Sequence, residues 1–157
     1  MPPLFSKILV ALDGSDCSFQ ALDYACQLAK QDARCTLVLV HVIDQRAVDS
    51  ARMVHLEPMI QEIITNLHTQ GETLLSEALA VPKRHGVTAT SVLDQGVIAQ
   101  RILACAKEHQ CDLIVIGSHG RSGLRRLLIG SVAHAVAQLA PDRVLIVRER
   151  KDETPRK

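Results

Sequence analysis

The residues with the clearest chemical potential lie between positions 117 and 131, where glycines are combined with serines and arginines. Gly117 and Gly120 are followed, after nine further residues, by the pair Gly130-Ser131. The segment comes directly after a short apolar run, and another apolar segment begins where it ends. Glycines in this setting let the backbone approach an anion, and Gly130 and Ser131 would present backbone N–H groups and a hydroxyl to phosphates at the start of a helix. The pattern predicts a bound phosphate, and with it a nucleotide.

Each of these residues also has a purely structural interpretation. A glycine can simply make a turn, and Ser131 can cap a helix. Arg121, Arg125 and Arg126 could neutralise phosphate charge or lie on a solvated basic face. His119 could contact a ligand or be exposed beside the turn. Only the whole set, placed directly after an apolar strand, favours nucleotide binding over an ordinary turn.

Asp13 is a further candidate, at the end of the apolar run 6–12 and directly before Gly14. Its carboxylate could accept a hydrogen bond from a base or lie near a metal ion. It could also be the first residue of an Asp-Gly turn. Its position at the carboxyl end of a predicted strand favours the functional interpretation, because ligands of open α/β sheets bind at that edge.

Composition and charge limit the class of protein. The chain has 157 residues, of which 47% are hydrophobic, and this predicts one soluble domain over residues 1–150 with a charged tail at 151–157. A net charge of +1 and only three aromatic residues, one Tyr and two Phe, argue against a nucleic-acid partner. The sequence shows neither a signal peptide nor an apolar segment long enough to span a membrane, so we expect a cytoplasmic protein without a membrane partner.

Several enzyme classes are excluded because their motifs are missing. The sequence has no G-x-x-x-x-G-K-[ST], no G-x-G-x-x-G after the first apolar run, no G-x-S-x-G and no H-E-x-x-H. No general base with a nucleophile beside it is visible, so no catalytic residue is predicted. The seven histidines and five cysteines show no metal-site spacing. We expect free thiols, with Cys26 and Cys105 packed in the core.

Five apolar runs alternate with segments of helical periodicity, which predicts an α/β fold with a parallel sheet covered on both faces. Ser15 is the predicted N-cap of the first helix, and residues 44–56 are predicted to be a loop. If the strands before Asp13 and Gly117 are neighbours, both candidates meet in one crevice, but periodicity leaves that adjacency open. The predicted strands are 6–12, 36–43, 87–93, 112–116 and 144–148; the later helices are 58 to Pro82 and Gly86, 97–109 and 130–139.

The chain resembles the universal stress protein family over nearly its whole length. Residues 8–15, 40–43 and 144–148 resemble the family's opening, its second-strand ending and its last strand. Gly117, Gly120, Gly130 and Ser131 fit the family's G-x2-G-x9-G-[ST] motif at every defined position. The resemblance implies a Rossmann-like open sheet of five parallel strands in the order 3-2-1-4-5, which makes the first and fourth strands neighbours.

The resemblance also implies a function. Family members that bind ATP hold the base near the positions of Asp13 and Val42 and the phosphates near Gly130, often with Mg2+ or Mn2+. They commonly form homodimers through the last strand, here Val144, Leu145, Ile146 and Val147. We therefore expect an ATP-binding regulatory protein with an unknown protein partner; the alternatives are a slow ATPase and a nucleotide-free dimeric interaction protein. The expected nucleotide-binding residues are Ala11, Leu12, Asp13, Val42, Ile116, Gly117, His119, Gly120, Arg121, Gly130, Ser131, Val132 and Ala133.

Overall fold

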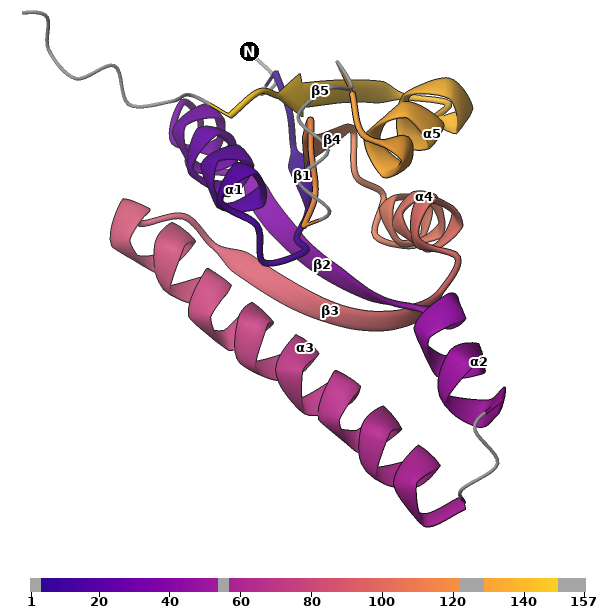
Figure 1. Ribbon diagram of the computed structural model, residues 1–157. Helices are drawn as coiled ribbons and strands as arrows, with labels where there is room; N and C mark the ends of the chain where they lie inside the picture. The colour runs from indigo at the N-terminus through magenta and orange to yellow at the C-terminus, as the bar shows by residue number, and fades with distance from the viewer. Residues whose placement is uncertain (1–3, 54–56, 122–128, 150–157) are drawn as a thin grey trace, which may run out of the picture.

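The computed structural model describes residues 4–53, 57–121 and 129–149, and its centre is one parallel sheet (Figure 1). The strand order is β3-β2-β1-β4-β5, as expected. β1 pairs with β4, from Ile8 beside Leu113 to Ala11 beside Ile116, so the first and fourth strands are neighbours. The strands are β1 (Lys7–Ala11), β2 (Thr36–Asp44), β3 (Ala89–Gly96), β4 (Leu113–Gly117) and β5 (Arg143–Val147).

Helices cover both faces of this sheet. α1 (Asp16–Ala29) and α3 (Glu57–His85) lie on one face, and α4 (Ile98–Glu108) and α5 (Ser131–Leu139) lie on the other (Figure 1). Side chains alternate along β1, so that Ile8 and Val10 pack toward the first pair of helices and Leu9 and Ala11 toward the second. Strands buried on both faces need continuous Ile, Leu and Val, which is the composition of β1, β2 and β4.

Helix α1 begins as the sequence predicts. Ser15 is its N-cap residue, and the Ser15 hydroxyl accepts a hydrogen bond from the N–H of Ser18 at 3.2 Å. This satisfies one of the N–H groups that a helix leaves unpaired at its start. The capped turn fixes where α1 starts relative to the end of β1, and both lie at the edge of the sheet where the candidate residues gather.

The prediction of a loop at 44–56 is wrong for most of that segment. Asp44 is the last residue of β2, and a further helix, α2 (Gln45–Met53), follows directly; residues 54–56 lie outside the described part. Only Val48 and Ala51 are buried in α2, so the apolar period is too short to read from the sequence. The helix is held by packing against α3 and β2.

The predicted end of the long helix is only partly right. Gly86, with φ of +69°, ends α3 in the left-handed conformation, but Pro82 lies inside the helix. Proline is tolerated there because it removes a single intrahelical hydrogen bond near the C-terminal end, and the Pro82 side chain is itself fully buried. Strand β3 is displaced from the predicted 87–93, because it continues to Gly96 alongside the longer β2.

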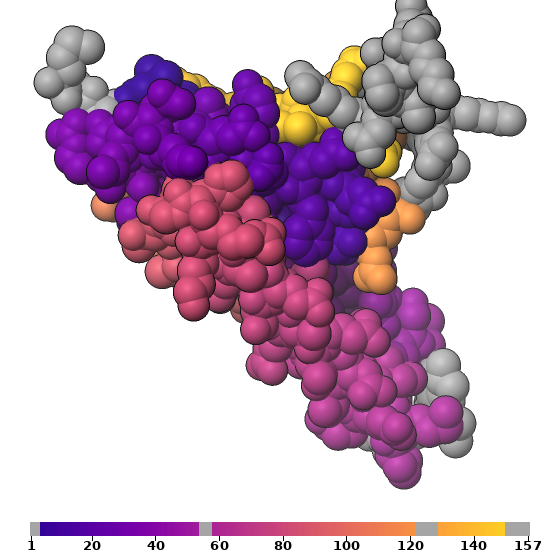
Figure 2. Space-filling view, turned by 90° about the vertical axis from the view of Figure 1, so that its left-hand side faces the viewer, coloured from indigo at the N-terminus to yellow at the C-terminus, as the bar shows by residue number. Residues whose placement is uncertain are grey.

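The 29-residue helix α3 gives the molecule its elongated outline. Figure 2 shows α3 lying across one face, with its N-terminal part and α2 projecting beyond the rest of the protein. Within the described ranges, no helix is both long and apolar enough to cross a membrane. The predicted charged tail at 151–157 lies outside the described residues.

Candidate functional site

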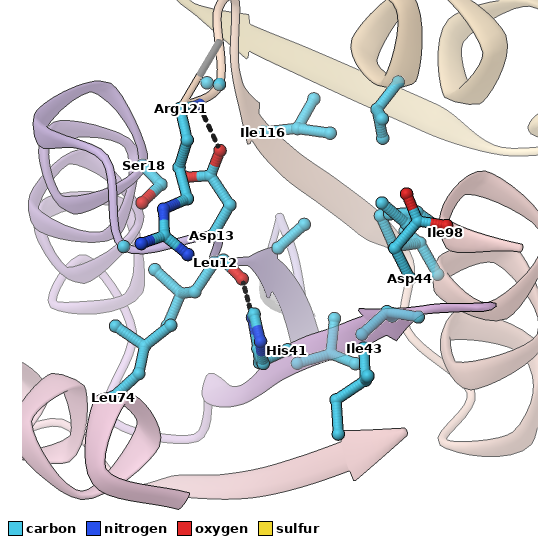
Figure 3. Close-up of a pocket in the computed structure, with 18 of the residues that line it drawn as sticks. Leu12, Asp13, Ser18, His41, Ile43, Asp44, Leu74, Ile98, Ile116 and Arg121 are labelled. Carbon is cyan, nitrogen blue, oxygen red and sulfur yellow. Dashed lines mark hydrogen bonds between the residues drawn. The ribbon is translucent and has the colours of Figure 1, made fainter. Parts of the chain in front are cut away.

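A cavity of about 900 Å³ opens at the carboxyl ends of β1, β2 and β4 (Figure 3). It lies where the order of strands reverses, the place where open parallel sheets bind ligands. The structure brings every residue expected to bind the nucleotide to its walls, while Arg125 and Arg126 lie outside the described residues. Those wall residues are Ala11, Leu12, Asp13, Val42, Ile116, Gly117, His119, Gly120, Arg121, Gly130, Ser131, Val132 and Ala133.

Ser118 joins the two halves of the glycine motif. Its N–H donates to the carbonyl of Val147 at 2.8 Å, which continues the pairing of β4 with β5. Its carbonyl accepts from the N–H of Gly130 at 2.6 Å, so the end of β4 lies against the start of α5. A Cβ at Gly130 would lie 3.1 Å from that carbonyl oxygen. Glycine at this position therefore allows the close approach of the two segments.

The N-terminus of α5 offers the cavity a row of backbone donors. Gly130 is the N-cap residue, and its own N–H is occupied by Ser118, so the expectation that Gly130 presents this group to a ligand is wrong. The N–H groups of Ser131, Val132 and Ala133 precede the first intrahelical bond, which runs from His134 to Gly130. No side chain of the described residues caps them. They carry the positive end of the helix dipole into the cavity.

Asp13 bridges the two loops at the mouth of the cavity. Its Oδ1 accepts from the N–H of Ser15 at 2.9 Å and from the Ser15 hydroxyl, and its Oδ2 accepts from the N–H of Arg121 at 3.0 Å (Figure 3). These bonds occupy three of roughly four acceptor positions that a carboxylate has. The carboxylate therefore fixes the turn at Gly120 and Arg121 to the start of α1.

Contacts within the protein explain why two of the motif positions lack a side chain. A Cβ at Gly117 would lie 2.9 Å from Sγ of Cys17, and one at Gly120 would lie 2.6 Å from Oδ2 of Asp13. Gly117 thus lets the end of β4 approach the first turn of α1, and Gly120 makes room for the bridging carboxylate. Contact of either glycine with a ligand stays a prediction.

The backbone of Val42 faces the same cavity. The ladder between β1 and β2 ends where the N–H of Leu12 donates to the carbonyl of Val40 at 2.8 Å. Backbone groups of a strand alternate between its two neighbours, so the N–H and C=O of Val42 also face the β1 side. Among the described residues neither group is paired on that side, and the Leu12 carbonyl, which the Val42 N–H would reach, bonds instead to the His41 ring, 2.8 Å from Nδ1. Val42 thus offers a donor and an acceptor side by side.

Sequence reasoning missed the wall that α3 supplies. Five polar side chains of α3, at the relative positions 0, 3, 4, 7 and 11 of one helix face, line the cavity beside Leu67 and Leu74. The hydroxyls of Thr69 and Thr73 donate to carbonyls one turn earlier, at 3.0 and 2.8 Å, which leaves their oxygens as acceptors. The spacing is visible in the sequence, but an exposed helix face has the same pattern. The five are Asn66, Thr69, Gln70, Thr73 and Glu77.

The charges and hydroxyls of the site give little support for catalysis. Arg46 forms a 2.7 Å ion pair with Asp44, and its hydrogen bonds hold the pKa of that carboxyl below its usual value. The Ser118 hydroxyl lies 2.9 Å from Nδ1 of His119, but Ser118 is only 1% exposed and presents no nucleophile. The described residues contain no group of three or more His, Cys, Asp or Glu side chains suited to a metal ion.

Comparison with known proteins indicates one family. The model of the universal stress protein family matches residues 4–148. Universal stress protein YxiE of Bacillus subtilis is 40% identical over 149 residues, which cover 92% of this chain and all of that protein. Hypothetical protein MJ0577 of Methanocaldococcus jannaschii shares the fold, with a TM-score of 0.84 over 94% of this chain and 99% of its own at 24% identity.

A further similar structure was solved with a nucleotide. It is a universal stress protein in complex with cAMP, with a TM-score of 0.65 and 26% identity over 92% of this chain and 97% of its own. The family match covers all of the described strands and helices and the whole glycine motif. From the first strand to the last, this chain belongs to the universal stress protein family.

Proposed function

We propose that this protein binds an adenine nucleotide, ATP, in the cavity at the end of the sheet and acts as a nucleotide-dependent regulatory module. One observation carries the proposal. A single cavity joins the uncapped N-terminus of α5 to the unpaired backbone groups of Val42. The first suits a phosphate chain, and the second suits the hydrogen-bonding edge of a base.

The N-terminus of α5 is the part of the cavity that suits the phosphates. The N–H groups of Ser131, Val132 and Ala133 and the Ser131 hydroxyl are the donors, and the helix dipole favours a negative charge at this end. Hydrogen bonds to charged groups contribute about 1.5–3 kcal/mol each, so a few such donors are sufficient for measurable affinity. The guanidinium of Arg121, exposed at the rim, is available to the outer phosphates.

The backbone of Val42, on β2, is the part of the cavity that suits the base. The N–H of Val42 would donate to N1 of adenine, and the C=O of Val42 would accept from the 6-amino group. Apolar side chains line the cavity on that side and would flank the ring, among them Ile98 and Ile116. The relative solved with cAMP supports an adenine ligand for this cavity.

The residues present also fit a nucleotide that brings its own Mg2+ or Mn2+. The described walls have no cluster of three metal-binding side chains, and Asp13 is occupied by Ser15 and Arg121. Mg2+ commonly keeps several waters and is held mainly by phosphate oxygens. The Ser131 hydroxyl is a protein candidate for a ligand of the ion at the phosphate end. The ion would neutralise phosphate charge there.

A pair of substitutions at one residue tests the phosphate site. Proline is well accepted at the first position of a helix, and Gly130, with φ of −68° and ψ of 159°, already has the extended backbone that precedes proline. Ser131→Pro thus removes the N–H and the hydroxyl while α5 is kept, whereas Ser131→Ala removes only the hydroxyl. By calorimetric titration with MgATP, we expect about tenfold weaker binding for Ser131→Pro and a smaller loss for Ser131→Ala.

The same titration separates the proposal from its alternatives. Equal affinity of Ser131→Pro and the unsubstituted protein would overturn the site at α5. Absence of any nucleotide binding by the unsubstituted protein would favour a nucleotide-free interaction protein. Steady-state phosphate release well above one turnover per minute would favour the ATPase. Inosine triphosphate, whose 6-oxo group accepts where the adenine amine donates, tests the base contact, and we expect it to bind more weakly than ATP.

A further inference from the structure

His41 lies on β2 directly before Val42, on the face of the sheet that α3 covers. Its ring turns back toward the end of β1, where Nδ1 lies 2.8 Å from the carbonyl oxygen of Leu12 (Figure 3). A carbonyl oxygen only accepts hydrogen bonds, so Nδ1 must carry the proton. The ring is half-buried, and the bond spans 29 positions of the chain.

This bond takes the place of a rung of the sheet. In a parallel ladder the rung after Leu12 N–H to Val40 C=O would run from Val42 N–H to Leu12 C=O. That rung is not formed, and β1 ends at Ala11, one residue before Leu12. The Leu12 carbonyl is satisfied by a side chain, while the backbone of Val42 remains directed at the cavity.

Helix α3 holds the ring in place. Gly71, in the middle of α3, faces His41 and Leu93; a Cβ there would lie 3.0 Å from Cδ2 of His41 and 2.6 Å from Cδ1 of Leu93. Glycine inside a helix costs about 1 kcal/mol relative to alanine. Its presence is accounted for by the space that the imidazole ring and Leu93 need between α3 and the sheet.

We propose that His41 is a positioning residue for base recognition: by holding the Leu12 carbonyl, it keeps the N–H and C=O of Val42 free to bind the base. The inference rests on the proposed nucleotide site for its consequence, but its geometric part concerns the protein without ligand. Loss of the imidazole donor frees the Leu12 carbonyl. The Leu12 carbonyl then completes the next rung with Val42 N–H and withdraws the donor from the cavity.

Two substitutions of His41 separate the donor from the bulk of the ring. His41→Phe keeps an aromatic ring and removes the donor, whereas His41→Asn keeps an N–H donor close to the position of Nδ1. The first measurement uses protein without nucleotide: the NMR coupling across a hydrogen bond between the Val42 amide and the Leu12 carbonyl, with the exchange rate of the Val42 amide. We expect the coupling and slower exchange in His41→Phe alone.

The second measurement compares ATP with inorganic triphosphate, which has no base. We expect His41→Phe to weaken ATP binding about tenfold, the size of one lost hydrogen bond, and to leave triphosphate binding unchanged. His41→Asn should bind ATP nearly as well as the unsubstituted protein. A general structural defect would weaken both ligands together, and that result would overturn the inference.

The outcomes also distinguish the inference from the proposed function. If the unsubstituted protein binds no nucleotide, the proposed function fails, while the Val42 coupling still decides the geometric part. If ATP binds but His41→Phe binds it equally well, the role of His41 is refuted and the nucleotide site stands. A Val42–Leu12 coupling already present in the unsubstituted protein would also refute it.

Discussion

Asp13 and Gly120 form a pair whose residue types depend on each other. The Asp13 carboxylate bonds to the Ser15 and Arg121 amides, and its Oδ2 occupies the space where a side chain at Gly120 would begin. Apart from Gly120 itself and its two neighbours in the chain, only Oδ2 and Cγ of Asp13 lie within 4 Å of that position among the described atoms. The space would therefore open if the carboxylate were removed, which makes the dependence testable by a double-mutant cycle.

We predict that Gly120→Ala lowers the free energy of unfolding by about 1–3 kcal/mol in the unsubstituted protein, because the new methyl group overpacks against Oδ2. In an Asp13→Ala background the same substitution should cost much less. Urea denaturation of the four proteins measures the coupling. If Gly120→Ala costs the same in both backgrounds, the carboxylate does not explain the glycine.

The cysteines make a separate prediction about pH. All five thiols are free and buried, and desolvation raises the pKa of Cys26, Cys105 and Cys111 from 9.0 to about 11. A raised pKa in the folded state means that the unfolded state loses its protons first. These thiols therefore contribute full stability below about pH 9, and this contribution is lost as the pH rises toward 11.

We predict that a variant with alanine at positions 26, 105 and 111 shows a shallower fall in unfolding free energy between about pH 9 and 11 than the unsubstituted protein. Denaturation midpoints across that range measure it, and the comparison cancels the lysines and the tyrosine that both proteins share. A thiol reagent at pH 8 should label these cysteines only after unfolding. Rapid labelling of the folded protein would contradict their burial.

At the scale of elements, the distance between α3 and the sheet depends on Gly71. Alanine gains helix propensity, about 1 kcal/mol, but its methyl group would press on His41 and Leu93. We predict that Gly71→Ala is destabilising on balance by about 1–2 kcal/mol, because overpacking costs more than the propensity gains. Ser76→Ala, on an exposed side of the same helix, is the matched control and should be neutral or stabilising. A higher melting temperature for Gly71→Ala would contradict the close packing.

The sequence predicted those elements whose pattern is local and strong. Strands β1, β2 and β4 are continuous apolar runs, and Ser15 and Gly86 mark helix ends by their own conformational preferences. Helix α2 could not be predicted, because two buried residues define no period and its stability comes from α3 and β2. The resemblance supplied the neighbourhood of β1 and β4, because periodicity does not encode strand order.

The candidate site likewise contains residues that local sequence signals predicted and residues that only the packed fold brings together. The glycine motif and Asp13 were predicted, since turns and helix starts leave a mark in residue type. The α3 wall and the His41 bond to Leu12 were missed, because both bring residues that are far apart in the sequence together through packing. The role of Gly130 was half right: the position belongs to the cavity wall, but its N–H serves Ser118. Such competition for a donor is visible only once the two segments meet.

At the scale of the whole molecule, the cavity and the open edge of β5 are linked through β4. Ser118 bonds to Val147 at the end of β5 and to Gly130 at the start of α5, so one residue contacts both regions. If the β5 edge and the cavity are coupled, Ser118 is the residue through which a shift of β5 would reach the phosphate end. Any such coupling must be reciprocal in free energy. The oligomeric state at β5 is therefore relevant to the nucleotide site.

We predict a homodimer through β5, whose residues Val144 to Val147 are apolar yet only half-buried on an edge strand. Val147 directs its carbonyl at Ser118 in the loop after β4, so the backbone of Ile146 faces the open edge by alternation. Ile146→Pro removes an outward N–H and spares the β4 ladder, since proline is tolerated on that side of an edge strand. Sedimentation velocity should show the unsubstituted protein as a dimer and Ile146→Pro as a folded monomer.

Leu145→Pro, which breaks the pairing with β4, should instead lower the melting temperature sharply. A dimer that survives Ile146→Pro would exclude pairing through the backbone of β5.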